Sequence, residues 1–219
     1  MSLNSFLLMR HEILLLAITL LLIVGEIFIP KHKKGSIVHL ALFLFGIHTV
    51  VGFLTIEESS LFGGMFQTNN LIHFFKNTLN VGVLVLLLQS ADWIQEKIVQ
   101  KNKGTEFFIL LFTSLLGMYF MISAGDFLMF YIGLELATLP VAALAAYETS
   151  KRISSEAGIK FILSAGFASG VALFGISLLY ATTGSIYFNE VMEVITSNNL
   201  TILSSRVKLS VSLSKMEIL

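Results

Sequence analysis

The sequence predicts an all-α, polytopic membrane helix bundle with about six transmembrane helices and the N-terminus outside. Three observations lead to this prediction. Of the 219 residues, 55% are hydrophobic and only 13% are charged, which is about half the charge of an ordinary soluble domain. The mean hydropathy is +0.85. Long apolar runs also recur along the chain, and short charged segments separate most of them.

Each apolar run is long enough to cross a bilayer. The hydrocarbon core is about 30 Å thick, so a helix that rises 1.5 Å per residue needs about 20 residues to span it. Backbone polar groups cannot stay unpaired in lipid, so each run is expected to be helical. The predicted spans cover residues 9–29, 36–56, 71–91, 105–124, 127–147 and 155–182.

The ends of these runs are marked by residues that helices in lipid avoid. Pro30 and the basic segment 31–34 end the first run, and Glu57 ends the second. A charged loop is expected to follow the third. Gly125 and Asp126 predict a tight turn between the fourth and fifth. The sixth run is long, so we expect that it tilts or that its first turn lies outside the membrane.

A cleaved signal peptide is the alternative interpretation of the first run. Its length is compatible with such a leader, but Glu26 interrupts the apolar stretch, and no small-residue cleavage site precedes Pro30. The basic segment 31–34 is better suited to anchoring a helix end. We therefore predict a retained transmembrane helix.

The basic residues between the runs predict the orientation. Eight Lys and Arg residues lie in the segments after the first, third and fifth runs, and none lies in the segments after the second and fourth. Because Lys and Arg accumulate on the cytoplasmic side, the odd-numbered segments are predicted to be cytoplasmic.

Composition excludes several classes of function. The 14 Lys and Arg balance the 14 Asp and Glu, so no net field would attract nucleic acid. The absence of Cys excludes a thiol nucleophile and Cys-ligated metal sites. His39 and His48 are two and a half helical turns apart, face opposite sides and cannot share a metal. We expect the lipid bilayer as a partner, and no metal or nucleic acid.

Glu135 is the clearest candidate for a functional residue. It lies near the middle of the fifth predicted span, roughly 13–18 Å from either end. A charge at that depth costs about 2.5–3.5 kcal/mol on insertion scales, and a carboxyl kept there could hold and release a proton. The alternative is a protonated Glu that bonds a neighbouring helix for packing only.

Two more residues accompany Glu135. Pro140, five residues further on, removes the backbone bond to the carbonyl of Leu136 and should kink the helix. Lys160 lies roughly 8 Å into the sixth span, where it either joins a proton path or extends back to the interface. Its depth differs from that of Glu135, so direct contact is not expected. Three further charged residues near span ends are expected at the interface: Glu12, Glu26 and Lys76.

Two long motifs resemble a known family. They read GDFLMFYIGLELATLPVAALAAY and SSEAGIKFILSAGFASGVALFGISLLYATTGSIYF. Together they resemble subunit N of bacterial NADH-quinone oxidoreductase, respiratory complex I, one of its antiporter-like proton-pumping subunits. The first motif carries Gly133, Glu135 and Pro140, and the second carries Glu156 and Lys160. The resemblance covers about residues 5–190, with Thr138 and Phe161 as mild departures from the family pattern.

The resemblance implies a function and partners. Glu135 would match the family's fifth-span glutamate and Lys160 its sixth-span lysine, both in proton translocation. The chain itself would hold no cofactor, because NADH, FMN, iron–sulfur clusters and quinone would bind in other subunits. Its partners would be the other membrane subunits of complex I in the inner (plasma) membrane. A subunit of a multi-subunit cation/proton antiporter is the alternative, because such subunits share these motifs.

The family has about fourteen spans, and six are predicted here. The seventh family span carries a lysine in a Lys-Leu-Ser context; Lys208-Leu209-Ser210 resembles only its start. We therefore divide the chain into residues 1–190, the N-terminal part of an antiporter-like membrane domain, and residues 191–219, a polar and non-native or disordered tail. A truncated gene product is expected, and an inactive fragment is the third hypothesis.

Overall fold

Six long helices form the architecture, as predicted. The computed structural model describes residues 8–28, 35–54, 58–101 and 105–196. Their apolar runs form helices because lipid offers the backbone no other hydrogen-bond partner. The long helices are α2 (Arg10–Phe28), α3 (Gly35–Gly52), α4 (Asn70–Lys101), α5 (Thr105–Ser123), α6 (Phe127–Ala145) and α7 (Arg152–Thr183).

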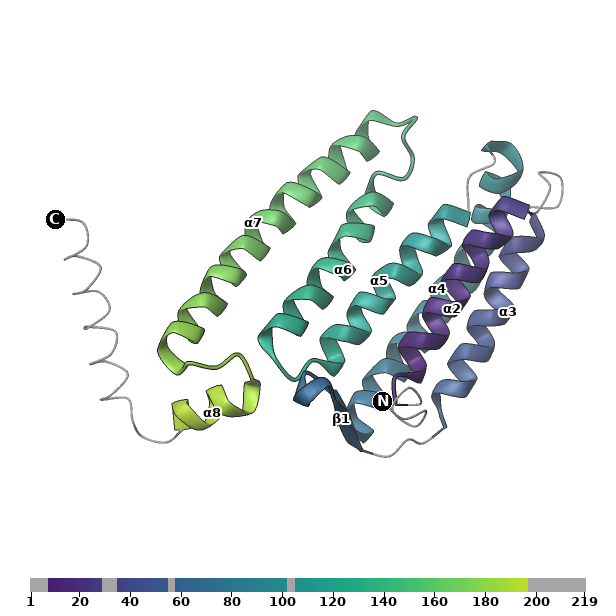
Figure 1. Ribbon diagram of the computed structural model, residues 1–219. Coiled ribbons are helices and arrows are strands. Elements are labelled where there is room, and N and C mark those ends of the chain that lie inside the picture. The colour runs from purple at the N-terminus through teal and green to yellow at the C-terminus, as the bar shows by residue number, and fades with distance from the viewer. Residues whose placement is uncertain (1–7, 29–34, 55–57, 102–104, 197–219) are drawn as a thin grey trace.

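The helices stand side by side (Figure 1). Helix α5 packs against α2, α4 and α6, and α3 packs against α2 and α4. Helix α7 packs mainly on α6 and lies at the far side of the molecule from α3. Five of the described helices are long and apolar enough to cross a membrane, and the segment Ile37–Gly52 is a shorter apolar helix. The prediction of an all-α polytopic bundle is confirmed.

Helix α4 is longer than the sequence analysis predicted. We expected a charged loop after residue 91, but the helix continues to Lys101, so this prediction was wrong. Charged residues end a span because they leave the lipid, yet Gln, Glu and Lys are good helix formers in water. Helix α4 therefore continues as a helix past the end of its apolar part.

A small hairpin and a short helix complete one end of the bundle. The hairpin consists of β1 (Ser59–Leu61), the 3-10 turn η2 (Phe62–Gly64) and β2 (Phe66–Thr68), with β1 antiparallel to β2. Helix α8 (Phe188–Thr196) lies near it at the same end as the start of α2 (Figure 1). We call this end of the molecule the outer end, following the predicted orientation. Only residues 191–196 of the predicted tail 191–219 are described, and they belong to α8.

The turn between α5 and α6 ties the outer end together. The backbone N–H of Gly125 donates to the carbonyl of Met65 at 2.7 Å, and the N–H of Phe127 donates to the carbonyl of Ile186 at 3.0 Å. Asp126 caps α6, because its Oδ1 accepts a bond from the N–H of Met129 at 2.6 Å. The predicted tight turn at 125–126 is thus confirmed, and it anchors both the hairpin and the segment before α8.

Helices α5 and α6 approach each other closely. A Cβ atom added to Gly117 would overlap the backbone of α6 at Gly133 and Ala137, and one added to Gly133 would lie 2.7 Å from the amide nitrogen of Met121. Small residues allow such close contact between helices in lipid. By contrast, a Cβ atom added to Gly166 or Gly170 of α7 would meet no described atom within 4 Å.

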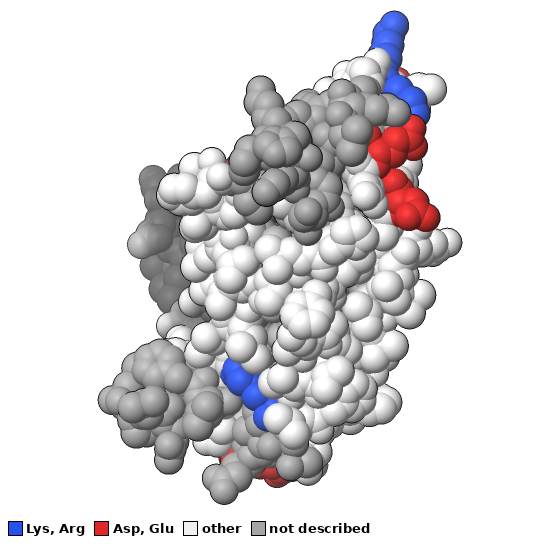
Figure 2. Space-filling view, turned by 90° about the vertical axis from the view of Figure 1, so that its right-hand side faces the viewer, with Lys and Arg blue, Asp and Glu red and all other residues white. Residues whose placement is uncertain are grey.

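The outside of the bundle is apolar between its ends. Figure 2 shows a broad face without charged side chains, with charged residues gathered mainly toward the top of the view. Many large apolar side chains of α2, α3 and α7 are exposed on the protein surface. Such a surface is compatible with lipid and not with water.

Candidate functional sites

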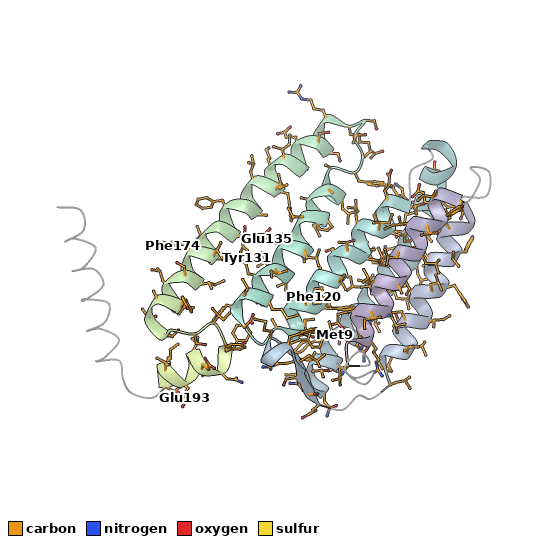
Figure 3. All side chains as sticks on the ribbon, viewed as in Figure 1. Met9, Phe120, Tyr131, Glu135, Phe174 and Glu193 are labelled. Carbon is orange, nitrogen blue, oxygen red and sulfur yellow. The ribbon has the colours of Figure 1, made fainter. Side chains whose placement is uncertain are left out.

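Glu135 lies in the interior of α6, as predicted, and is half-buried. In the view of Figure 3 its side chain lies between α6 and α7. Among the described residues, no hydrogen-bond donor reaches its carboxylate. The described helices therefore hold this carboxyl at mid-helix depth and leave its oxygens available for further contacts.

Lys160 lies on an exposed face of α7. Its Nζ forms an ion pair with Glu156 Oε1 at 2.7 Å, one turn earlier on the same helix, and its side chain is 75% exposed. The structure therefore does not bring Glu135 and Lys160 together, in agreement with the depths inferred from the sequence. Whether either residue moves protons stays a prediction.

Pro140 is buried within α6, which continues to Ala145. Close by, the Ser114 hydroxyl of α5 donates to the carbonyl of Ala137 at 2.9 Å. This bond gives α6 a polar partner from another helix in the turn that proline interrupts. A bend at Pro140 stays a prediction.

A second group of ionisable residues, not recognised from the sequence, is buried at the outer end of α2–α5. Lys76 Nζ of α4 lies 2.5 Å from Glu12 Oε1 of α2, and the two side chains are only 1% and 3% exposed. The prediction that both residues lie at the interface was wrong. The ammonium group also lies over the rings of Phe66 and Tyr119, at 5.1 and 5.8 Å from their centroids. Mutual pairing replaces the water that each charge would otherwise need.

Three histidines surround this ion pair. His11 Nε2 lies 3.2 Å from His73 Nδ1, and His73 Nε2 lies 2.9 Å from the Thr68 hydroxyl. His48 Nε2 lies 3.1 Å from the Tyr119 hydroxyl, which in turn donates to Asn80 Oδ1. The His11 ring is 5.9 Å from the rings of both His48 and Tyr119. We call these residues, with Glu12 and Lys76, the outer cluster: His11, Glu12, His48, His73, Lys76, Asn80 and Tyr119.

The two histidines of α3 have different surroundings. His39 is exposed and His48 is buried, so the prediction that they face opposite sides is confirmed. His48 bonds within the protein, as a packing histidine would, but it does so as part of a larger network. Among the described residues, no three His, Asp or Glu side chains are arranged to hold a metal ion.

A sequence signal for the outer cluster exists. Glu12 lies in the first turn of α2, and Lys76 lies two turns into α4. Both helices begin at the outer end, so opposite charges at similar depth are expected to pair. We had considered each charge alone, and the predicted span ends placed both close enough to water to need no partner.

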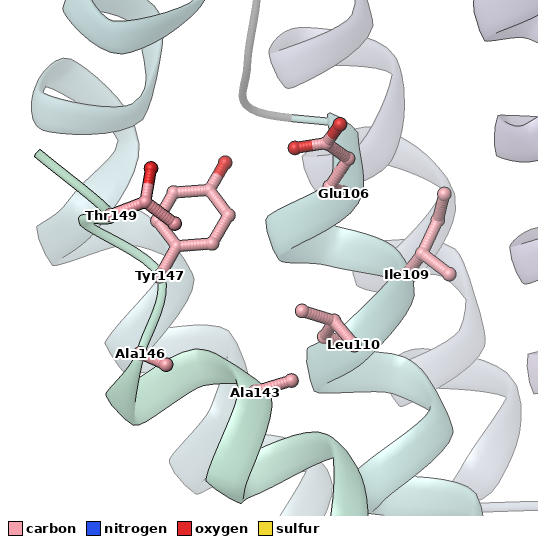
Figure 4. Close-up of a pocket in the computed structure, with 7 residues that line it drawn as sticks. All are labelled: Glu106, Ile109, Leu110, Ala143, Ala146, Tyr147 and Thr149. Carbon is pink, nitrogen blue, oxygen red and sulfur yellow. The ribbon is translucent and has the colours of Figure 1, made fainter. Parts of the chain in front are cut away.

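The opposite end of α5 and α6 holds a pocket of about 530 Å³. Figure 4 shows its mainly apolar walls, which are formed by Glu106, Ile109, Leu110, Ala143, Ala146, Tyr147 and Thr149. The buried Tyr147 hydroxyl has no partner among the described residues. Burial, followed by the carboxylates of Glu106 and Glu26, raises the pKa of Tyr147 to about 12.

Comparison with known proteins identifies the relatives of this chain. Residues 124–216 match the family model described as NADH:quinone oxidoreductase/Mrp antiporter, TM. NADH-quinone oxidoreductase subunit N of Phocaeicola vulgatus is 39% identical over 93% of this chain and 43% of its own length. Its counterpart from Azobacteroides pseudotrichonymphae is 36% identical over 91% of this chain and 42% of its own length.

Solved structures share the fold. A chain of respiratory complex I from Thermus thermophilus with bound aureothin aligns with a TM-score of 0.63 at 22% identity, over 81% of this chain and 38% of that one. A chain of the membrane-bound sulfane sulfur reductase, an archaeal respiratory membrane complex, aligns with a TM-score of 0.68 at 19% identity, over 88% of this chain and 40% of that one.

The present chain spans about two-fifths of the length of these relatives. Its polytopic helical fold and the matches over nine-tenths of the chain agree with one another. Over nearly its whole length, this multi-pass membrane protein is homologous to NADH-quinone oxidoreductase subunit N.

Proposed function

We propose that this chain is part of a membrane subunit of a proton-translocating NADH:quinone oxidoreductase. The observation that carries the proposal is the 39% identity to subunit N over 93% of the chain. NADH, FMN, iron–sulfur clusters and quinone would bind in other subunits, and this chain would take part in moving protons across the inner (plasma) membrane.

Within this function, Glu135 is the proton-switching residue and Lys160 is a relay. Glu135 is suited to proton switching because it lies at mid-helix depth and no donor among the described residues reaches its carboxylate oxygens. Lys160 suits the relay role because its ion-pair partner among the described residues, Glu156, lies on its own helix, so its ammonium can move without breaking an ion pair between helices. Pro140 has no N–H to donate to the carbonyl of Leu136, the residue after Glu135, so that carbonyl can bind water.

The experiment that tests the assignment is isolation of the full chain, carrying an affinity tag, from its native membrane under mild detergent. We expect NADH-oxidising activity and the peripheral redox subunits to co-purify with it. The same isolation from cells that carry the untagged chain gives the background. Purification of this chain without any NADH-oxidising activity contradicts the proposal.

A cation/proton antiporter subunit is the second candidate, because the matched family model includes the Mrp antiporter. The same isolation separates the two proposals. Co-purification with other membrane antiporter subunits, together with cation-dependent proton flux and no redox subunit, would support the antiporter and refute the NADH:quinone oxidoreductase.

A further inference from the structure

The outer cluster has unused hydrogen-bonding capacity beside a cavity. Within the described part of the chain, six buried polar atoms in and beside the outer cluster have no partner: Arg10 Nε, His11 Nδ1, Glu12 Oε2, His48 Nδ1, Asn77 Oδ1 and Asn80 Nδ2. Buried polar groups usually find partners, so several orphans in one place indicate exchange with water or protons. The outer ends of α3 and α4 enclose a cavity of about 200 Å³, with Gly52, His73 and Asn77 in its wall.

This cavity has room for water. A water molecule occupies about 30 Å³ in the liquid, so the space holds several. The cavity wall contains the His73 ring, the Asn77 amide and the polar side chain of Asn70. His73 thus contacts the cavity on one side and His11 on the other, since its Nδ1 lies 3.2 Å from His11 Nε2.

Two neutral imidazoles in series form a proton relay. Each ring can accept a proton on one nitrogen and release a proton from the other, after which it is again neutral. The second nitrogen of His73, Nε2, lies 2.9 Å from the Thr68 hydroxyl. When Nε2 takes up a proton through that hydroxyl, the proton on Nδ1 can pass to Nε2 of His11, 3.2 Å away. His11 returns a proton to His73 by the reverse step, and His73 releases one to water. Every ring gains one proton and loses one, so charge is conserved.

The surrounding charges disfavour a histidine ring that stays protonated. The ionisable groups that the described elements bring here are Arg10, His11 and Glu12 of α2, His48 of α3, His73 and Lys76 of α4, and Tyr119 of α5. Glu12 is paired with Lys76, and a second carboxylate, that of Glu58, accepts a hydrogen bond from Asn70 of the cavity wall at 3.3 Å. Arg10 and Lys76, when charged, would repel a lasting positive charge on the His11 ring.

We propose that the outer cluster contains a proton-exchange site, in which protons from the aqueous phase at the outer end enter through the cavity at His73 and pass to His11. The site is separate from Glu135, and it does not depend on the proposed redox partner.

The first experiment measures water access. The chain has no Cys, so Asn77→Cys introduces a single thiol into the cavity wall. A charged, membrane-impermeant thiol reagent is added to the full chain in lipid nanodiscs. We expect Asn77→Cys to react about tenfold or more faster than Val81→Cys, which lies one turn deeper on the exposed face of α4, because thiolate forms in water and not in lipid. Equal rates overturn the proposed entry.

The second experiment measures proton transfer. Solvent exchange of the His11 ring proton is followed by ¹⁵N NMR in the same nanodiscs. His73→Phe keeps a ring in place but removes both nitrogens, and it should slow the exchange about a hundredfold or more, the lower end of a typical acid–base contribution. His39→Phe, on the exposed face of α3, should leave the rate unchanged. The signal of the His48–Tyr119 hydrogen bond reports whether each variant is folded.

A third variant keeps the test decisive if His73→Phe does not fold. Asn77→Leu fills the cavity without removing either imidazole, and it should also slow the exchange at His11. An exchange rate at His11 that is unchanged in the folded variants refutes the relay. Because these measurements use the chain alone, their failure is distinct from a failure to co-purify with redox subunits.

Discussion

The ionisable residues of α2–α5 and those of α6–α7 differ in their burial and in where their ion-pair partners lie. In the apolar stretch of α5, 39% is buried inside the protein, compared with 6% in the apolar stretch of α7. The ionisable residues of α2–α5 pair across helices, as Glu12 and Lys76 do, whereas Lys160 pairs along its own helix. The Glu12–Lys76 ion pair therefore joins two helices, whereas the ion pair of Lys160 lies within one helix.

This difference separates structural from functional roles. A buried pair between helices contributes to stability whatever else it does, because removal of one partner leaves a charge without solvation. A group paired on its own helix, or not paired, can change without unfolding the protein. We therefore expect substitutions in the outer cluster to affect stability strongly and substitutions at Lys160 or Glu135 to affect mainly proton movement.

The largest expected effect is at the buried ion pair. Lys76→Met should lower the free energy of unfolding by about 3–5 kcal/mol, because Glu12 would remain buried without a partner. The double variant with Glu12→Gln should recover most of this loss. Reversible unfolding in mixed detergent–lipid micelles measures both.

Lys151→Met is the matched control, because Lys151 pairs with Glu148 at 2.7 Å while 68% exposed. It should cost about 0–1 kcal/mol. A loss at Lys76 as small as at Lys151 would show that the outer pair does not join the helices.

The next effect is at the closest helix contact. Gly117→Ala should destabilise the protein by about 1–3 kcal/mol, because its Cβ would overlap the backbone of α6. Gly82→Ala, where an added Cβ meets nothing within 4 Å, should be neutral or stabilising by up to about 1 kcal/mol. Thermal unfolding of both variants provides the comparison, and equal midpoints would contradict the close packing of α5 on α6.

A smaller effect concerns Tyr147 and depends on pH. Burial raises the pKa of Tyr147 from the ordinary tyrosine value of 10.0 to about 12 in the folded protein. Its contribution to stability is therefore complete below pH 10 and is lost as the pH rises to about 12. Tyr147→Phe should flatten this alkaline loss by at most about 1 kcal/mol after discounting for solvent screening. Identical alkaline unfolding of both proteins would place the hydroxyl in water.

The smallest stability effect is expected at Lys160. Lys160→Ala removes an exposed i,i+4 pair and should change the free energy of unfolding by less than about 0.5 kcal/mol. The same detergent–lipid unfolding assay measures it. A loss of several kcal/mol would mean that α7 uses Lys160 to join helices, and the contrast between the two parts of the molecule would disappear.

The sequence predicted the helices better than it predicted their contacts. Apolar length is a local property, so the six predicted spans correspond to α2–α7 within a few residues at most ends. The hairpin β1–β2 was missed because its strands have three residues each, too few to show an alternating pattern. The extension of α4 was missed because charge marks the end of a span but not the end of a helix.

The same distinction holds for the sites. The depth of Glu135 follows from its position within one helix, and the structure agrees. The outer cluster depends on which helices are neighbours: Glu12 and Lys76 are 64 residues apart, and His48 and Tyr119 are 71 apart. Hydropathy describes each stretch of sequence by itself, so it does not predict contacts between residues this far apart in the chain.

The most direct test of the account is proton translocation at Glu135. Vesicles that carry the assembled complex are prepared with Glu135→Gln in this chain, and with Glu193→Gln on the exposed face of α8 as the control. The account predicts that Glu135→Gln lowers the number of protons moved per electron by about tenfold or more, while NADH oxidation by an artificial acceptor and the amount of folded protein stay the same. An unchanged proton-to-electron ratio in a fully assembled Glu135→Gln complex would contradict it.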